Sequence, residues 1–169
     1  MALGRFVLPT DEDFLRRAIA LAVANVEAGA GGPFGAVVVR GGEIVGEGAN
    51  SVTRRLDPTA HGEVNAIRDA CRRLQVFALE GCTLYTSCEP CPMCLAACYW
   101  AGIARVVYGA TQQDAAAAGF GDAALYGEFA LQPEARALPT ECRLQAEAQA
   151  AFAAWQNAAG RTDYGRLET

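Results

Sequence analysis

The sequence has little of what a membrane protein, a secreted protein or a nucleic-acid-binding protein needs. No apolar stretch approaches the roughly 18 residues of a membrane span, and the first apolar run is too short for a secretion signal. Basic residues are also few, since 14 Lys and Arg face 19 Asp and Glu for a net charge of −5. Because nonspecific nucleic-acid binding needs a basic surface, we expect a cytoplasmic protein with neither a membrane nor a nucleic acid as partner.

The chain also lacks internal repeats and any linker rich in Pro, Gly or Ser that would separate domains. Its 169 residues suffice for one domain with a substantial hydrophobic core. Hydrophobic residues make up 52% and charged residues 20%, which is ordinary globular composition and excludes disorder. We therefore expect a single domain over residues 1–169.

The chain has a single histidine, His61, but seven cysteines. Five of the cysteines fall between Cys82 and Cys98, and their total is odd. A disulfide framework is therefore disfavoured, and a metal site is the better interpretation. Cys88 is expected to pack at the end of a strand, and small buried hydrophobic positions are expected for Cys71, Cys82, Cys98 and Cys142.

The hydrophobic pattern predicts a hairpin followed by strands that alternate with helices. Helices are expected after the capping pair Thr10 and Asp13, after the turn at Asp57, and after Glu89. This order predicts an α/β fold, a three-layer α/β/α sandwich around a mixed five-stranded sheet. The expected strands are 36–39, 43–49, 82–87, 104–110 and 141–146, and the later helices are 113–118, 122–129 and 149–159.

Two short motifs carry metal-site chemistry, His61-Gly62-Glu63 and Pro90-Cys91-Pro92-Met93-Cys94. Cys91 and Cys94 lie one helical turn apart, so both sulfurs can be directed at one point. With His61 at the same point, three protein ligands would bind zinc and the fourth tetrahedral position would stay open, as catalysis requires. Zinc lowers the pKa of its bound water to about 7, which makes hydroxide available at neutral pH.

Glu63 is placed to carry protons at such a site. It follows the predicted ligand His61 by two residues, so it could take the proton of the water and pass it to a ring nitrogen and a departing amine. The pattern H-x-E…P-C-x-x-C is typical of zinc nucleobase deaminases, and it predicts an aminohydrolase with one zinc per chain. The alternative is a non-catalytic zinc module, in which Cys88 or Glu63 closes the site as a fourth ligand.

Longer segments resemble the cytidine-deaminase-like superfamily and, within it, the bacterial guanine deaminases. The similarity extends from about residue 14 to residue 164, and the block TSCEPCPMC is its most specific part. The segments that carry the resemblance are 31–39 (GGPFGAVVV), 57–64 (DPTAHGEV), 84–94 (LYTSCEPCPMC), 114–122 (DAAAAGFGD) and Asp163-Tyr164.

The resemblance implies hydrolysis of guanine to xanthine and ammonia, a reaction of purine salvage or catabolism. Zinc hydroxide would attack C2 of the base, with Glu63 as the proton shuttle. The same chemistry on guanosine, on another aminated purine or a triazine, or on an adenosine in tRNA is the alternative. The acidic composition argues against tRNA, because tRNA binding needs basic surface.

The resemblance also implies which residues contact the base. Asn50 matches an asparagine that hydrogen-bonds the base, and Asp122 matches an acidic residue near the substrate. Phe34 and Trp100 match aromatic residues that line the purine pocket or stack on the ring. Gly62 departs from the family, which usually has alanine there, but it keeps the backbone N–H that would contact the substrate.

The C-terminal segment is implied to act across a dimer. In the resembled family, a tyrosine that matches Tyr164 closes the active site. The segment of about 147–169 is exchanged between the two subunits of a homodimer. We therefore expect a homodimer with this swap, and a small purine base as the other partner.

Overall fold

The computed structural model describes residues 8–164, apart from the side chain of residue 123, and these form two compact units. The first unit ends at Leu125, and the second is Tyr126–Thr169, so that the boundary falls within helix α6 (Asp122–Ala130). Within the described residues, no helix combines the length and apolar character needed to cross a membrane.

One mixed sheet of four strands forms the centre of the first unit, in the order β2-β1-β3-β4. β1 runs antiparallel to both β2 and β3, whereas β3 and β4 run parallel. The four strands lie within two residues of the predicted ones, and the α/β class is confirmed. Their bounds are β1 Gly35–Arg40, β2 Glu43–Ala49, β3 Thr83–Cys88 and β4 Arg105–Ala110.

The predicted fifth strand at 141–146 is wrong. Residues 141–144 form no strand, and helix α7 (Gln145–Asn157) begins directly after them. The backbone at Leu144 is left-handed, with φ 54°, which interrupts an extended strand. Apolar and polar residues alternate in ECRLQA, which suggested a strand, but this alternation is short. The Ala- and Gln-rich sequence that follows has a stronger preference for a helix.

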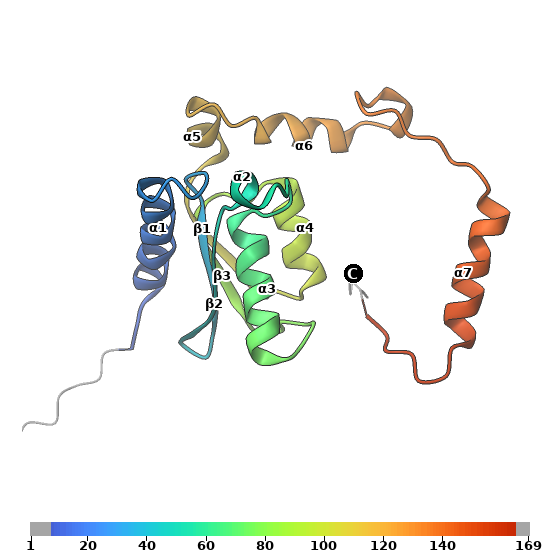
Figure 1. The fold of residues 1–169 in the computed structure, drawn as a ribbon, viewed down its shortest axis with the longest axis horizontal. Helices are drawn as coiled ribbons and strands as arrows, with labels where there is room; N and C mark the ends of the chain where they lie inside the picture. The colour runs from blue at the N-terminus through green and yellow to red at the C-terminus, as the bar shows by residue number, and fades with distance from the viewer. Residues whose placement is uncertain (1–7, 165–169) are drawn as a thin grey trace, which may run out of the picture. The chain divides into compact units, whose positions relative to one another are not determined.

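Helices cover both faces of the sheet, which confirms the three layers (Figure 1). Helix α1 (Asp11–Glu27) packs on one face, where Phe14 meets Tyr85 and every second residue of β1. Helices α3 (Gly62–Leu74) and α4 (Pro92–Trp100) pack on the other face. The core there is built from the intervening strand residues, because neighbouring side chains of a strand point to opposite faces.

The remaining helices are short or lie late in the chain. The predicted helices 113–118 and 122–129 are confirmed within a residue, and the last helix begins four residues earlier than predicted. The short helix α2, directly after β2, was not predicted. These elements are α2 Val52–Arg55, α5 Gln112–Ala117, α6, the 3-10 helix η1 Pro133–Ala135, and α7.

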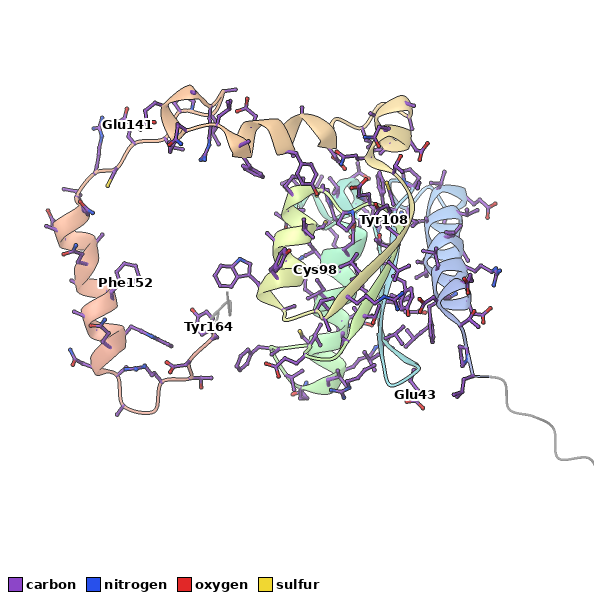
Figure 2. The ribbon with its side chains drawn as sticks, turned by 180° about the vertical axis from the view of Figure 1, so that it is seen from behind. Glu43, Cys98, Tyr108, Glu141, Phe152 and Tyr164 are labelled. Carbon is purple, nitrogen blue, oxygen red and sulfur yellow. The ribbon has the colours of Figure 1, made fainter. Side chains whose placement is uncertain are left out.

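The second unit leaves most of its apolar side chains exposed. No residue of α7 is buried, and Phe152 on this helix is 69% exposed (Figure 2). Trp155 packs edge to face against Tyr164, with 5.8 Å between the ring centroids. Cys142 is exposed and Cys71 is only half-buried, so the expectation that both are buried hydrophobic positions is wrong.

An ion pair and a buried tyrosine fasten the start of α1 to the sheet. The Tyr85 hydroxyl donates to Asp11 Oδ1 at 2.7 Å, and Arg105 donates to both oxygens of the same carboxylate. Burial, reinforced by the hydrogen bond to Asp11, raises the pKa of Tyr85 to about 12.

Replacing Tyr85 with phenylalanine is expected to lower the free energy of unfolding by about 1 kcal/mol at pH 8. An unfolded tyrosine ionises near pH 10. Because its folded pKa is higher, Tyr85 loses its stabilising effect as the pH rises from about 10 towards 12. Urea unfolding at pH 8 and pH 11 should therefore show that Tyr85→Phe costs less at pH 11. An equal cost at both pH values would contradict this role of the hydroxyl.

Candidate active site

The helices that carry the predicted metal ligands begin at those ligands. His61 is the N-cap residue of α3 and Cys91 is the N-cap residue of α4, with Cys94 in the first turn. Neither His61 nor Cys91 caps its own helix through a side-chain hydrogen bond. Both side chains are therefore available to a shared partner, whereas an N-cap side chain commonly bonds the helix backbone.

The structure brings these three side chains together at zinc-binding distances. His61 Nδ1 lies 3.6 Å from Cys91 Sγ and 3.5 Å from Cys94 Sγ. A tetrahedral zinc with bonds of about 2.3 Å to sulfur and about 2.0 Å to nitrogen separates such atoms by about 3.5 Å. Across residues 8–164, His61, Cys91 and Cys94 are the one group of three or more candidate ligands. The residues present therefore fit zinc.

The sulfur of Cys91 is electrostatically prepared for a metal. Hydrogen bonds from the Cys94 thiol and from His61 lower the pKa of Cys91 to about 4. Its hydrogen bond to Cys91 raises the pKa of His61, so the ring is a donor to the thiolate. Zinc binds thiolate and neutral imidazole, and it would therefore replace the proton that these groups share.

Glu63 is the buried carboxylate of the site. Its side chain is 5% exposed, and burial raises its pKa. The Cys94 thiol donates to Glu63 Oε2 at 3.4 Å, which places the carboxylate beside the metal ligands without making it one of the group. A carboxyl group with a raised pKa can both accept and donate a proton near neutral pH.

Cys88 does not join the ligand group either. Its sulfur donates to the backbone oxygen of Thr111 at 3.5 Å, and burial raises the pKa of this thiol to about 11. Cys88 is also not in the group of residues whose ligand atoms lie within 4.8 Å of one another. With Glu63 and Cys88 outside the group, three protein ligands leave a fourth position open, which favours a catalytic over a closed structural site.

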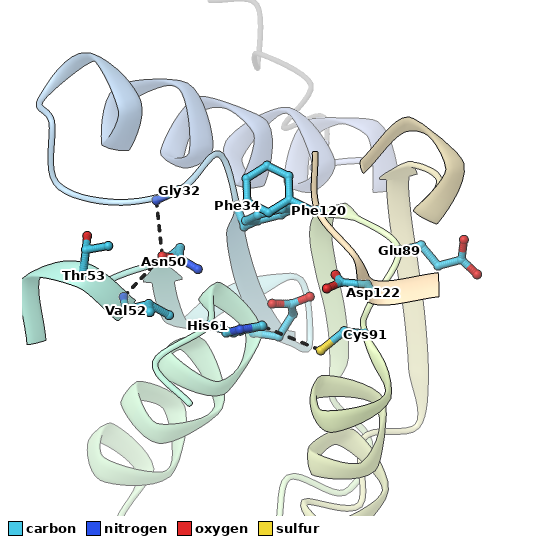
Figure 3. Close-up of a pocket in the computed structure, with 11 residues that line it drawn as sticks. Gly32, Phe34, Asn50, Val52, Thr53, His61, Glu89, Cys91, Phe120 and Asp122 are labelled. Carbon is cyan, nitrogen blue, oxygen red and sulfur yellow. Dashed lines mark hydrogen bonds between the residues drawn. The ribbon is translucent and has the colours of Figure 1, made fainter. Parts of the chain in front are cut away.

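A cavity of about 280 Å³ opens directly above these residues. His61, Glu63, Cys91 and Asp122 all line it, and Figure 3 shows Asp122 near Cys91. Burial raises the pKa of the Asp122 carboxyl. The aromatic ring of Phe34 closes another side. The cavity lining thus contains three predicted side chains of the metal and proton chemistry, His61, Glu63 and Cys91, and the predicted base contacts Phe34 and Asp122.

Asn50, at the end of β2, faces the same cavity with a fixed amide. Its Oδ1 accepts hydrogen bonds from the backbone N–H groups of Gly32 and Val52, each at 3.3 Å (Figure 3). The reversed amide would set its NH₂ group against two N–H donors. The NH₂ group is therefore the end that is left for a ligand.

Gly62 lets helix α3 approach the loop before β1 closely. A Cβ atom at this position would lie 3.1 Å from the carbonyl oxygen of Phe34. An alanine, the usual residue of the resembled family, therefore fits only if the backbone shifts by a few tenths of an ångström. Residue 62 is the first residue of the helix, between His61 and Glu63.

Two predicted base contacts of the first unit, Gly62 and Trp100, are not among the residues that line this cavity. Trp100 lies at the end of α4 and is 63% exposed. Tyr164 belongs to the second unit, where its ring contacts Trp155 and is 68% exposed. Its predicted role in closing the site remains a prediction.

Several residues that line the cavity were not predicted from the sequence. Phe120 packs edge to face on Phe34, with 4.8 Å between centroids, and its position between Gly119 and Gly121 was the available signal. Glu89 lies inside the recognised TSCEPCPMC block, but its carboxylate accepts from the backbone and side chain of Gln112. The missed residues are Gly32, Val52, Thr53, Glu89 and Phe120.

Comparison with known proteins agrees with this geometry. Residues 8–110 match the model of the cytidine and deoxycytidylate deaminase zinc-binding region. The chain is 51% identical to the guanine deaminase of Bacillus subtilis (strain 168) over 90% of this chain and 98% of that one. The X-ray structure of the Bacillus subtilis guanine deaminase superposes with a TM-score of 0.89, covering 92% of this chain and 99% of the other.

More distant relatives share only part of the chain. The protein NE0047, solved in complex with 2,6-diaminopurine, is 34% identical with a TM-score of 0.65, covering 69% of this chain and 65% of the other. The tRNA-specific adenosine deaminase of Aquifex aeolicus (strain VF5) is 49% identical over 46% of this chain and 52% of its own. The chain is therefore a zinc-dependent hydrolytic deaminase of the cytidine and deoxycytidylate deaminase family, in the branch that contains the Bacillus subtilis guanine deaminase.

Proposed function

We propose that this protein hydrolyses guanine to xanthine and ammonia, as an enzyme of purine salvage or catabolism. The observation that carries the proposal is a buried carboxylate, Glu63, beside an open three-ligand metal group at one side of an aromatic cavity. The choice of guanine is supported by the name of the Bacillus subtilis relative. It is also supported by the 2,6-diaminopurine in NE0047, since this purine carries a 2-amino group like that of guanine.

Proton transfer falls to Glu63. When bound to His61, Cys91 and Cys94, zinc supplies a Lewis acid that makes hydroxide available from water at neutral pH. Glu63 would accept the proton released from that water and donate it to N3 of the ring as C2 is attacked. It would then accept the proton of the new hydroxyl on C2 and deliver it to the departing amine, which leaves as ammonia. A buried carboxyl group with a raised pKa is suited to both directions of transfer.

The cavity walls hold a flat, polar ring. The edge-to-face pair of Phe34 and Phe120 offers an aromatic surface for stacking. The NH₂ group of Asn50 and the N–H of Gly62 are donors, and the Asp122 carboxyl group is a partner for an N–H of the base. Orientation by these groups would bring C2 to the metal group and to Glu63.

The proposal is tested by ammonia release from the zinc-loaded protein with guanine, guanosine, adenine, cytosine and cytidine in parallel. Guanine should be turned over well above the other four. If guanosine or a triazine reacts and guanine does not, the zinc chemistry stands and the substrate assignment is wrong. If nothing reacts, tRNA with adenosine in its anticodon loop is assayed next, with binding that should weaken steeply with salt.

Replacing Phe120 with alanine is expected to raise the KM for guanine about tenfold, because edge-to-face pairing and stacking contribute about 1 kcal/mol or more. Zinc content should not change. The matched control is Phe77→Ala, which removes a ring that is 61% exposed and outside the cavity. An unchanged KM in Phe120→Ala would show that the ring does not contact the base.

We further propose a homodimer in which the segment of about 147–169 is exchanged and Tyr164 closes the partner's site. In support, the second unit exposes large apolar side chains that a monomer would leave in water. The side chains concerned are Phe129, Leu144, Phe152, Trp155 and Tyr164.

Complementation tests this exchange. Glu63→Gln removes the proton shuttle, and Tyr164→Ala removes the closing ring, so each homodimer should be impaired. In a swapped heterodimer, the subunit with intact Glu63 receives Tyr164 from the other subunit, and one site is complete. Co-refolded mixtures should therefore regain activity above the sum of the two variants. No gain in a mixture shown to contain heterodimers would contradict the exchange.

We also expect the protein to act in the cytoplasm. All seven cysteines are free thiols, five of them buried, and a reducing compartment preserves them. Localisation of a tagged copy in the source cell tests this expectation, and export to an oxidising compartment would contradict it.

A further inference from the structure

A buried asparagine outside the cavity holds the loop that presents Asn50. Asn25 lies in the last turns of α1 and is 8% exposed. Its NH₂ group donates to the backbone oxygen of Gly32 at 2.9 Å and to that of Asn50 at 2.8 Å. One side chain thus connects the two chain segments that meet at the Asn50 amide.

The same two segments are joined a second time by Asn50 itself. Gly32 N–H donates to Asn50 Oδ1, so that Gly32 is held by Asn25 through its oxygen and by Asn50 through its nitrogen. The packing is close, because a Cβ atom at Gly31 would lie 2.2 Å from the backbone oxygen of Asn50. The loop before β1 therefore cannot move away from Asn50 while these bonds persist.

A second, partly buried amide acts from the helix on the other face of the sheet. Asn65 of α3 donates to the backbone oxygen of Ala49 at 2.8 Å and to Ser51 Oγ at 3.1 Å. These are the two neighbours of Asn50 in the chain. Asn50 is thus fixed on its own backbone by Asn25 and on both flanking residues by Asn65.

The geometry points to Asn25 as the positioning residue that fixes the direction of the Asn50 amide and thereby selects bases with a hydrogen-bond acceptor at that end of the cavity. This inference rests on the proposed guanine deamination. Asn25 does not line the cavity, so it acts through Gly32 and Asn50 rather than on the base. Because Asn50 Oδ1 is occupied by two N–H groups, only a donor faces the ligand (Figure 3).

This donor distinguishes 6-oxopurines from 6-aminopurines. The edge of guanine distant from C2 carries the acceptors O6 and N7, whereas a 6-amino group places a donor where O6 would be. A donor that faces another donor leaves both unpaired, and an unpaired buried polar group is strongly unfavourable. If Asn25 is removed, the amide of Asn50 can rotate and present its oxygen, and the selection weakens.

The test compares guanine with 2,6-diaminopurine, which keeps the 2-amino group and differs at position 6. Steady-state kinetics of Asn25→Ala and of the isosteric Asn25→Asp are measured with both bases, together with zinc content and urea unfolding. We expect the guanine preference in kcat/KM to fall about tenfold in both variants, mainly through KM, with zinc content unchanged. Asn25→Gln, which keeps the NH₂ donor, should recover part of the preference.

Asp69→Ala is the matched control, since Asp69 is equally buried and accepts from the backbone N–H of Glu47, away from the cavity. It should lose stability and keep the base preference. If the Asn25 variants lose stability and keep the preference, Asn25 is merely structural and the inference is overturned. If the wild type does not deaminate guanine, the proposed function fails, and dissociation constants of the two bases decide the inference instead.

Discussion

Replacing Glu63 with glutamine is expected to abolish deamination while zinc stays bound. Glutamine has the same size as glutamate, and its NH₂ group can donate to the thiolate that zinc requires of Cys94, which contacts Glu63 at 3.4 Å, so the buried site should stay intact. The amide cannot carry a proton between water, ring and amine. A positioned proton-transfer group contributes about 10²–10⁴ to the rate, and Glu63 serves several transfers, so we expect kcat to fall at least about 10³-fold. Guanine kinetics and zinc per chain by elemental analysis measure both effects.

The matched control is Glu43→Gln, which makes the same chemical change on the exposed start of β2 (Figure 2). Its activity should equal that of the wild type. Glu63→Gln with wild-type turnover and bound zinc would show that another group moves the protons. Loss of zinc from Glu63→Gln would instead identify Glu63 as a ligand and favour a closed, structural metal site.

The chemistry of the site could be predicted because its residues lie in two short sequence segments, each at the start of a helix. His61 and Glu63 occupy the N-cap and the first turn of α3, and Cys91 and Cys94 occupy the same places in α4. Local geometry fixes each pair, and only their approach depends on the fold. The four strands were predictable for a similar reason, since β1 and β3 are short apolar runs between turn residues.

The aromatic wall could not be derived in this way. Phe120 contacts Phe34 although about 86 residues separate them in the sequence. An aromatic residue between two glycines is equally typical of an exposed turn, so the sequence does not show that Phe120 lines a cavity. Trp100 was assigned to the cavity by resemblance alone; it is exposed at the end of α4 and is not among the residues that line the cavity. Asn25 sits in an apolar helix pattern, where its two backbone partners become visible only once the fold is known.

Removing zinc is expected to abolish activity and to destabilise the protein strongly. Metal that binds only the folded state at 1,000 times its dissociation constant contributes about 4 kcal/mol to the free energy of unfolding. For a chain of this size we expect the melting temperature to fall by about 10 °C after chelation. Cys91→Ser should behave as the chelated protein does, because a buried hydroxyl replaces a thiolate with a pKa of about 4.

Cys142→Ser provides the control, because this thiol is exposed and outside the ligand group. It should keep zinc, activity and melting temperature. Adding zinc back to the chelated wild type should restore both activity and stability, whereas Cys91→Ser should recover neither at the same zinc concentration. Full turnover by a protein with less than a tenth of a zinc per chain would contradict the metal's role. A stable but inactive apo protein would show that the packing of α3 and α4 on the sheet holds the site without metal.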